Sequence, residues 1–124
     1  TGAKIVQDGI EAVGLLGTRF TMEEQFYRSI LEDTFGLRVV VPTADDRRLV
    51  DKVIFNELCR GVIADNSRQE YLRIVDSLAA QGCSAIILGC TEIALLIGSG
   101  DTDLKLYDTT QIHAQQAVAM MLDQ

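Results

Sequence analysis

Cys90 is the residue of this sequence best suited to chemistry. It stands in the run Gly89-Cys90-Thr91-Glu92, directly after the apolar segment 84–88. The pattern predicts a buried strand followed by a short helix, which puts the thiol near free backbone N–H groups at a helix start. Partial positive charge there stabilises a thiolate, so Cys90 could act as a nucleophile or as an acid–base group. The alternative is a small buried hydrophobe at a strand end.

Two neighbours of Cys90 carry side chains that could serve the same site. Thr91 could cap the helix or offer its hydroxyl to a ligand carboxylate. Glu92 could exchange a proton with the thiol or form hydrogen bonds at the site. The simpler interpretation is that Glu92 has no role at the site and lies in the first turn of the helix because the helix dipole favours an acidic residue there. Thr91 and Glu92 are therefore candidates for substrate binding.

A second polar loop, residues 17–21 (GTRFT), follows an earlier apolar run. The hydroxyls of Thr18 and Thr21, with free backbone N–H groups near a helix start, could hold a carboxylate. The alternative is a plain strand-to-helix turn in which Thr21 is the N-cap. This loop and residues 89–92 follow predicted strands, and ligands bind at the carboxyl ends of parallel strands. We therefore expect Thr18 and Thr21 near Cys90.

The other cysteines and the only histidine are weaker candidates. Cys83 is predicted to lie in the core, Cys59 could be in the core or face the site, and His113 lies in the last predicted helix. A phosphatase loop is excluded because Leu96 stands where a Cys-x5-Arg motif needs its arginine. The phosphate-binding patterns Gly-x4-Gly-Lys-Ser/Thr and Gly-x-Gly-x-x-Gly are also absent.

Composition limits the class of partner. The 124 residues fit one globular domain, and the formal net charge of −7 argues against nucleic acid and anionic membrane surfaces. No apolar run approaches the roughly 20 residues of a membrane span, and no signal-peptide pattern is seen. Three cysteines without a Cys-x-x-Cys pair argue against a disulfide framework or a metal site. Reduced thiols and a cytoplasmic location are expected.

Short apolar runs alternate with helical periodicity along the chain. Strands are predicted over 12–16, 37–41, 84–88 and 104–107. Helices are predicted over 3–10, 21–35, 45–60 and 67–81, from Cys90 to about 97, and over 109–122. This alternation predicts an α/β fold, a three-layer sandwich with a mostly parallel four-stranded sheet and helices on both faces.

Individual residues predict where the helices begin. Thr21 opens a Thr-x-x-Glu capping-box pattern and so begins the second helix. The inward-facing residues of that helix are predicted to be Phe26, Ile30 and Leu31. In the same way, Asn66 or Ser67 is predicted to cap the helix over 67–81.

The run 89–93 (GCTEI) closely resembles the second catalytic-cysteine motif of the aspartate/glutamate racemase family. The segment 13–22 (VGLLGTRFTM) is similar to the turn that opens the second domain of aspartate racemases. Other matching residues are Pro42, Thr43, Asp108 and His113. The resemblance extends essentially from end to end. Glutamate racemases usually carry His after Cys-Thr, so Glu92 points to the aspartate or mixed-specificity branch.

The resemblance implies a mechanism without pyridoxal phosphate, metal or any other cofactor. Two α/β domains close over an amino acid, and two residues on opposite faces of its α-carbon remove and return a proton. Cys90 would be one of these two residues. Thr18, Thr21, Thr91 and Glu92 would hold the substrate.

The family's first base stands in a Cys-Asn-Thr-like motif, which this sequence lacks. Residues 1–124 are therefore expected to be the C-terminal domain of a two-domain racemase, with helix 109–122 packing on the other domain. The whole enzyme is expected to act on aspartate or glutamate as a homodimer. The chain alone is expected to be inactive.

Both the substrate of the enzyme and the functional class of the protein have alternatives. Many aspartate racemases carry a lysine where Cys59 aligns, and its absence favours a broader aspartate/glutamate specificity. The same cysteine could serve a hydantoin racemase, a maleate isomerase or a decarboxylase. A further interpretation is a non-catalytic α/β binding module in which Cys90 is structural, and a slow reaction of that thiol at neutral pH would favour it.

Overall fold

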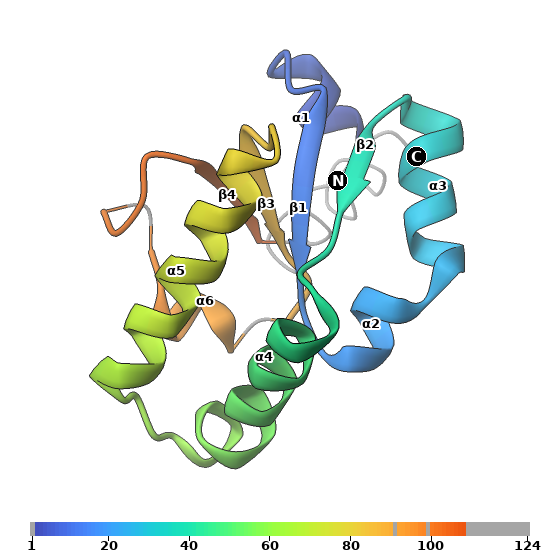
Figure 1. Cartoon of the computed structure of the whole chain (residues 1–124). Coiled ribbons are helices and arrows are strands. Elements are labelled where there is room, and N and C mark those ends of the chain that lie inside the picture. Colours follow the sequence, from blue (N-terminus) through green and yellow to red (C-terminus); the bar gives the residue numbers. More distant parts are fainter. Residues whose placement is uncertain (1, 91, 99, 109–124) are drawn as a thin grey trace, which may run out of the picture.

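A sheet of four parallel strands lies at the centre of the chain, in the order β2-β1-β3-β4 (Figure 1). The computed structural model describes residues 2–90, 92–98 and 100–108. The elements in chain order are α1 (Gly2–Gln7), β1 (Ala12–Leu16), α2 (Arg19–Glu23), α3 (Gln25–Phe35), β2 (Arg38–Val40), α4 (Ala44–Asn56), the 3-10 turn η1 (Leu58–Arg60), α5 (Asp65–Ala80), β3 (Ala85–Leu88), α6 (Ile93–Leu96) and β4 (Lys105–Asp108).

The strand pairing confirms the predicted fold class. Gly14 of β1 lies between Val40 of β2 and Ile86 of β3, and Leu88 of β3 pairs with Asp108 of β4. The two central strands β1 and β3 are buried along their whole length, as continuous apolar runs predict for parallel strands covered on both faces. Each predicted strand agrees with an observed one to within one residue at either end. The described sheet is wholly rather than mostly parallel.

Helices cover both faces of the sheet and complete the predicted three layers (Figure 1). Alternate side chains of a strand point to opposite faces. Leu16 and Ile86 therefore belong to the larger core under α4, α5 and α6. Val13 and Ile87 belong to the smaller core under α1 and α3. The two cores hold the strand ends in place and so position the loops that follow them.

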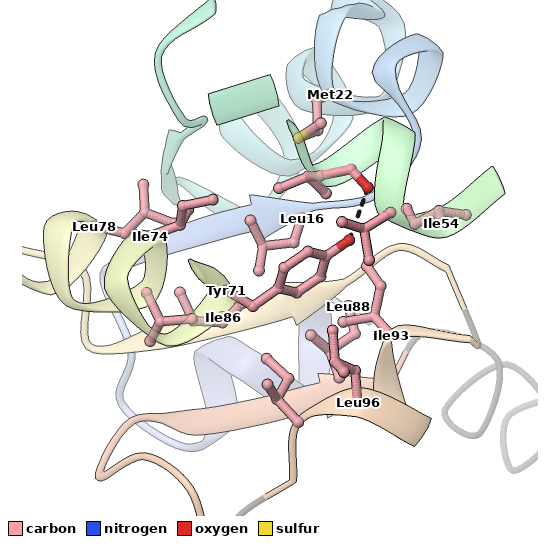
Figure 2. Packing of buried hydrophobic residues seen from close by; sticks show 14 of the residues in the cluster. Leu16, Met22, Ile54, Tyr71, Ile74, Leu78, Ile86, Leu88, Ile93 and Leu96 are labelled. Atoms are coloured by element: carbon pink, nitrogen blue, oxygen red, sulfur yellow. Dashed lines mark hydrogen bonds between the residues drawn. The ribbon is translucent and has the colours of Figure 1, made fainter. Parts of the chain in front are cut away.

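Tyr71 on α5 is the largest of the fully buried side chains in the larger core (Figure 2). Its hydroxyl donates a hydrogen bond to the carbonyl oxygen of Val50 on α4, at 2.7 Å. Burial raises the pKa of Tyr71 well above its usual value. The hydroxyl therefore stays protonated, and its one donor is satisfied within the core, as buried polar groups require.

The helix predicted to begin at Thr21 is two helices, and the predicted start is wrong. Thr18 is the N-cap of α2, because its Oγ1 accepts a hydrogen bond from the backbone N–H of Thr21 at 3.3 Å. Glu24 is extended and separates α2 from α3. Leu31 is buried as predicted, whereas Ile30 is 41% exposed. The Thr-x-x-Glu pattern misled because another threonine, three residues earlier, offers the same capping hydroxyl.

The later helices also differ at their boundaries. The helix predicted over 45–60 is α4 followed by η1. The predicted capping of α5 by Asn66 or Ser67 is wrong, since that helix follows Ala64 and has no side-chain cap. Ser67 instead donates a hydrogen bond to Oε1 of Glu57 at 2.7 Å. The Ser67 hydroxyl that the local pattern predicted to cap the helix thus forms a tertiary hydrogen bond instead.

Some predictions fall outside the described residues. They concern helix 109–122, with His113, and Thr91. The side chain of Phe26 is likewise not described. Among the described helices, none is both long and apolar enough to cross a bilayer.

Candidate functional site

The loop after β1 touches the loop after β3 at the carboxyl edge of the sheet. The backbone N–H of Gly89 donates a hydrogen bond to the carbonyl oxygen of Leu16 at 2.7 Å. A Cβ atom placed on Gly89 would lie 3.2 Å from Cγ2 of Thr21, and one placed on Gly17 would lie 3.6 Å from Cα of Gly89. The contact at Gly89 is tighter than an ordinary van der Waals contact and so favours a residue without a side chain there, whereas the distance from Gly17 to Cα of Gly89 is an ordinary contact. The packing therefore brings Thr21 against the residue that precedes Cys90.

Thr18 and Thr21 form one hydroxyl pair in the first of these loops. Their Oγ1 atoms lie 3.1 Å apart, and both residues are half-buried. The two threonines thus lie in the neighbourhood of Cys90, as expected. The alternative role of helix N-cap belongs to Thr18 and not to Thr21. A role of either hydroxyl in substrate binding stays a prediction.

Asp51 on α4 is a residue of this region that sequence reasoning missed. Its Oδ1 accepts a hydrogen bond from the backbone N–H of Arg19 at 2.7 Å, which fixes the start of α2 against α4. A carboxylate at a helix start is favoured by the helix dipole. No local signal could have found this contact, since the two residues lie 32 positions apart in the chain.

Cys90 is half-buried and packs against the larger core. Its thiol donates a hydrogen bond to Oε2 of Glu92, with Sγ and Oε2 2.8 Å apart. The helix α6 begins only at Ile93 and has four residues. Cys90 therefore precedes the helix by a turn instead of starting it, and its carbonyl oxygen accepts a hydrogen bond from the backbone N–H of Ile93 at 3.2 Å.

The predicted stabilisation of a thiolate at Cys90 is wrong. Burial raises the pKa of Cys90, and the hydrogen bond to the Glu92 carboxylate and its negative charge raise it further, to about 11. A backbone hydrogen bond at Glu92 offsets only part of this. Loss of water and a neighbouring negative charge both disfavour an anion. The resting group is therefore a neutral thiol that donates a hydrogen bond to a carboxylate.

The other two cysteines differ in environment. Cys83 is 4% exposed and belongs to the larger core, which confirms its prediction. Cys59 is exposed on η1, so it is not a core residue. Charge repulsion from Cys59 makes a small further contribution to the raised pKa of Cys90. A role of Cys59 at the site stays a prediction.

Three cavities in the described part of the chain are lined by other residues. One of about 550 Å³ lies at the opposite, amino edge of the sheet, beside Arg38, and one of about 370 Å³ lies beside residues 100–104. A third, of about 290 Å³, lies between the α2–α3 corner and the link from β2 to α4. Cys90 lines none of them, so the cleft expected beside its thiol stays a prediction. Among the described residues, no group of three His, Cys, Asp or Glu side chains could hold a metal ion.

The chain is similar in sequence and structure to known proteins. A family model described as Asp/Glu/hydantoin racemase matches residues 2–117. The structure of a candidate Asp/Glu racemase from Yersinia pestis superposes with a TM-score of 0.94 at 46% identity, over 98% of this chain and 53% of that one. An aspartate racemase homologue from Pyrococcus horikoshii gives a TM-score of 0.88 at 33% identity, over 96% and 52% of the two chains.

A more distant match shows a likeness of fold alone. The aspartate racemase of Picrophilus torridus gives a TM-score of 0.64 at 18% identity, over 86% of this chain and 44% of that one. The chain spans about half the length of the structures it matches. The family model and the two closer structures cover nearly all of its residues, and the chain therefore belongs to the Asp/Glu/hydantoin racemase family.

Proposed function

We propose that this chain supplies one half of the active site of a cofactor-independent amino-acid racemase of the aspartate/glutamate type. In this proposal Cys90 is one of two acid/base residues. The observation that carries it is the position of Cys90 at the carboxyl edge of the sheet, hydrogen-bonded to Glu92 and preceded by a glycine that packs on Thr21. Family membership supports the same class of reaction.

The protonation state of Cys90 suggests how the half-site works. Racemisation through two bases needs one group that removes the α-proton and another that delivers a proton to the opposite face. With a pKa of about 11, Cys90 rests as the proton donor for one enantiomer. After donation its thiolate is a stronger base than an ordinary thiolate, which suits the very weakly acidic α-proton in the reverse direction. Glu92 keeps the thiol protonated and oriented between turnovers.

The second base would come from a further domain of the whole protein. The support is that this chain spans about half of the matching structures. Exposed apolar side chains also lie on α2, α4 and α6, which occupy the region beyond the carboxyl ends of the strands (Figure 1). They are Phe20, Phe55 and Leu95. A covering domain would remove these side chains and the reacting carbon from water.

The substrate in this proposal is aspartate or glutamate, and the active enzyme is a homodimer. Thr18, Thr21 and Thr91 would supply hydroxyls for the α-carboxylate or ammonium group, and Glu92 would complete the site. Hydantoin racemase, maleate isomerase and decarboxylase chemistry are the alternatives within the family, and a panel of such substrates given to the full-length protein separates them. Aspartate and glutamate should be racemised fastest.

The decisive experiment measures conversion of the L to the D form of each amino acid, with uptake of deuterium at the α-carbon from heavy water. Full-length protein should catalyse racemisation, Cys90→Ala should abolish it, and Cys59→Ala should serve as the control that retains it. Retained racemisation in the Cys90→Ala variant would overturn the proposal.

The isolated chain should show no racemisation because one base cannot serve both faces of the α-carbon. Robust racemisation by the chain alone would overturn this expectation and point to Cys59 and Glu92 as a complete site within these residues. A non-catalytic binding module predicts no racemisation even at full length. Slow reaction of the Cys90 thiol at neutral pH does not separate it from the racemase, because the raised pKa of Cys90 predicts a slow reaction in both cases.

A further inference from the structure

Arg28, near the start of α3, is a half-buried cation without a partner among the described residues. Its Nε is buried, and no described atom accepts its proton. Other arginines are paired with carboxylates: Arg19, Arg48, Arg68 and Arg73. A buried guanidinium N–H without an acceptor costs free energy, so a group of this kind in a folded chain calls for an acceptor from outside it, a water molecule or a ligand.

Arg28 lines the cavity of about 290 Å³ at the α2–α3 corner. The other lining residues are Met22, Glu23, Val41 and Arg47. In Figure 1, α2 and α3 meet on the side of the sheet where the edge strand β2 lies. The cavity adjoins the candidate racemase site, because Met22 and Glu23 directly follow Thr21, but none of its lining residues is a candidate residue of that site.

The charges around this cavity sum to a positive site in an acidic chain. Glu23 is its one lining carboxylate, and both of its oxygens are already used: Oε1 accepts from Nε of Arg47 at 3.3 Å and Oε2 from Nε of Arg19 at 3.1 Å. Arg47 is held further by a hydrogen bond from Nη1 to the carbonyl oxygen of Pro42 at 2.7 Å. Glu23 therefore positions Arg47 and leaves the guanidinium of Arg28 uncompensated.

We infer that this cavity binds a small anion that carries carboxylate or phosphate oxygens, between Arg28 and Arg47. Guanidinium groups present planar forks of donors that match both kinds of oxyanion. Met22 and Val41 supply apolar walls, so the ligand is a compact anion rather than a long polyanion. The inference does not rest on the proposed racemase activity, because binding is measured without turnover.

The test is calorimetric titration of the chain in Tris chloride with inorganic phosphate and, separately, with succinate. At least one anion should bind saturably with a stoichiometry of one. Arg28→Met and Arg47→Met should each weaken that binding by about tenfold or more. The exposed neighbour Arg48 does not line the cavity, so Arg48→Met is the matched control and should bind normally. Binding of phosphate alone, of succinate alone, or of both identifies the oxyanion.

Thermal unfolding separates lost binding from lost structure. Arg28→Met removes a buried donor without an acceptor, so in Tris chloride it should melt at the same temperature as the parent or higher. The parent, but not this variant, should gain stability when the bound anion is added. The inference is overturned by absence of saturable binding up to roughly 10 mM of both anions, by unchanged binding in Arg28→Met, or by a large drop in its melting temperature without anion.

Discussion

The thiol of Cys90 donates a hydrogen bond to the carboxylate of Glu92, with 2.8 Å between Sγ and Oε2. A cysteine at a helix start would be expected to lose its proton easily, but here the first helical residue comes three positions later, at Ile93. The nearest charge to the sulfur is therefore a carboxylate. This pair accounts for a neutral resting thiol and connects the structure to measurable chemistry.

Glu92→Gln should lower the pKa of Cys90, because the amide still accepts a hydrogen bond but no longer repels the thiolate. Alkylation by iodoacetamide should be followed against pH in a Cys59→Ser background, where the buried Cys83 reacts slowly. The parent should show a midpoint near pH 11, and Glu92→Gln a lower one, with alkylation up to roughly tenfold faster at about pH 8. A midpoint that stays or rises would contradict the assigned role of Glu92.

The raised pKa of Cys90 should also make stability depend on pH at the alkaline end. The thiol of the unfolded chain has the ordinary pKa of 9.0, below the folded value of about 11. The folded chain therefore holds the thiol proton more tightly than the unfolded chain. The resulting contribution to the free energy of unfolding is complete below about pH 9 and is lost as pH rises through about 11. Urea unfolding of the parent and of Cys90→Ala across this range should show a steeper alkaline loss for the parent. If the unfolding free energies of the parent and of Cys90→Ala fall in parallel with pH, the raised pKa of Cys90 does not contribute to stability.

Gly89→Ala should destabilise the fold by about 1–3 kcal/mol, as overpacking does. Its Cβ would lie 3.1 Å from the carbonyl oxygen of Leu16 and 3.2 Å from Cγ2 of Thr21, so the two loops must move apart. Gly98→Ala is the matched control, since a Cβ there meets nothing within 4 Å. The control should change the free energy of unfolding in urea by less than about 0.5 kcal/mol. Equal effects of the two substitutions would show that the loops do not pack as described.

Thr18→Val should lower the free energy of unfolding by about 1 kcal/mol, because it removes the hydroxyl that caps α2. Thr21→Val keeps a methyl group against Gly89 and should cost less. Thr34→Val, on the exposed side of α3, is the control and should be nearly neutral. A larger loss of unfolding free energy for Thr21→Val than for Thr18→Val would show that Thr18 is not the residue that caps α2. In the full-length enzyme both variants should raise KM.

Tyr71→Phe should cost about 1 kcal/mol, since it removes the buried hydrogen bond to Val50 and keeps the ring. Tyr71→Ala should cost about 3–5 kcal/mol, because it also leaves a cavity in the larger core. Urea unfolding at neutral pH measures both. A loss for Tyr71→Phe as large as that for Tyr71→Ala would mean that the hydroxyl, and not the ring, dominates.

The sequence alone determined the fold class, the four strands and the loop that holds Cys90. Continuous apolar runs such as 84–88 are typical of strands buried on both faces, and their alternation with helical periods leaves few arrangements besides a parallel sheet. The same parallel order predicted that the loops after β1 and β3 would meet. These properties depend on residues close together in the chain.

The pairing of polar groups depends on the three-dimensional packing of the chain. The capping hydroxyl of α2 comes from Thr18, and Ser67 turns to Glu57 instead of capping its own helix. Asp51 reaches the start of α2 from 32 positions away. The protonation of Cys90 follows from how far the surrounding chain excludes water and where it sets one carboxylate. Such choices are separated by energies of about 1 kcal/mol, which packing between distant segments supplies and local patterns do not contain.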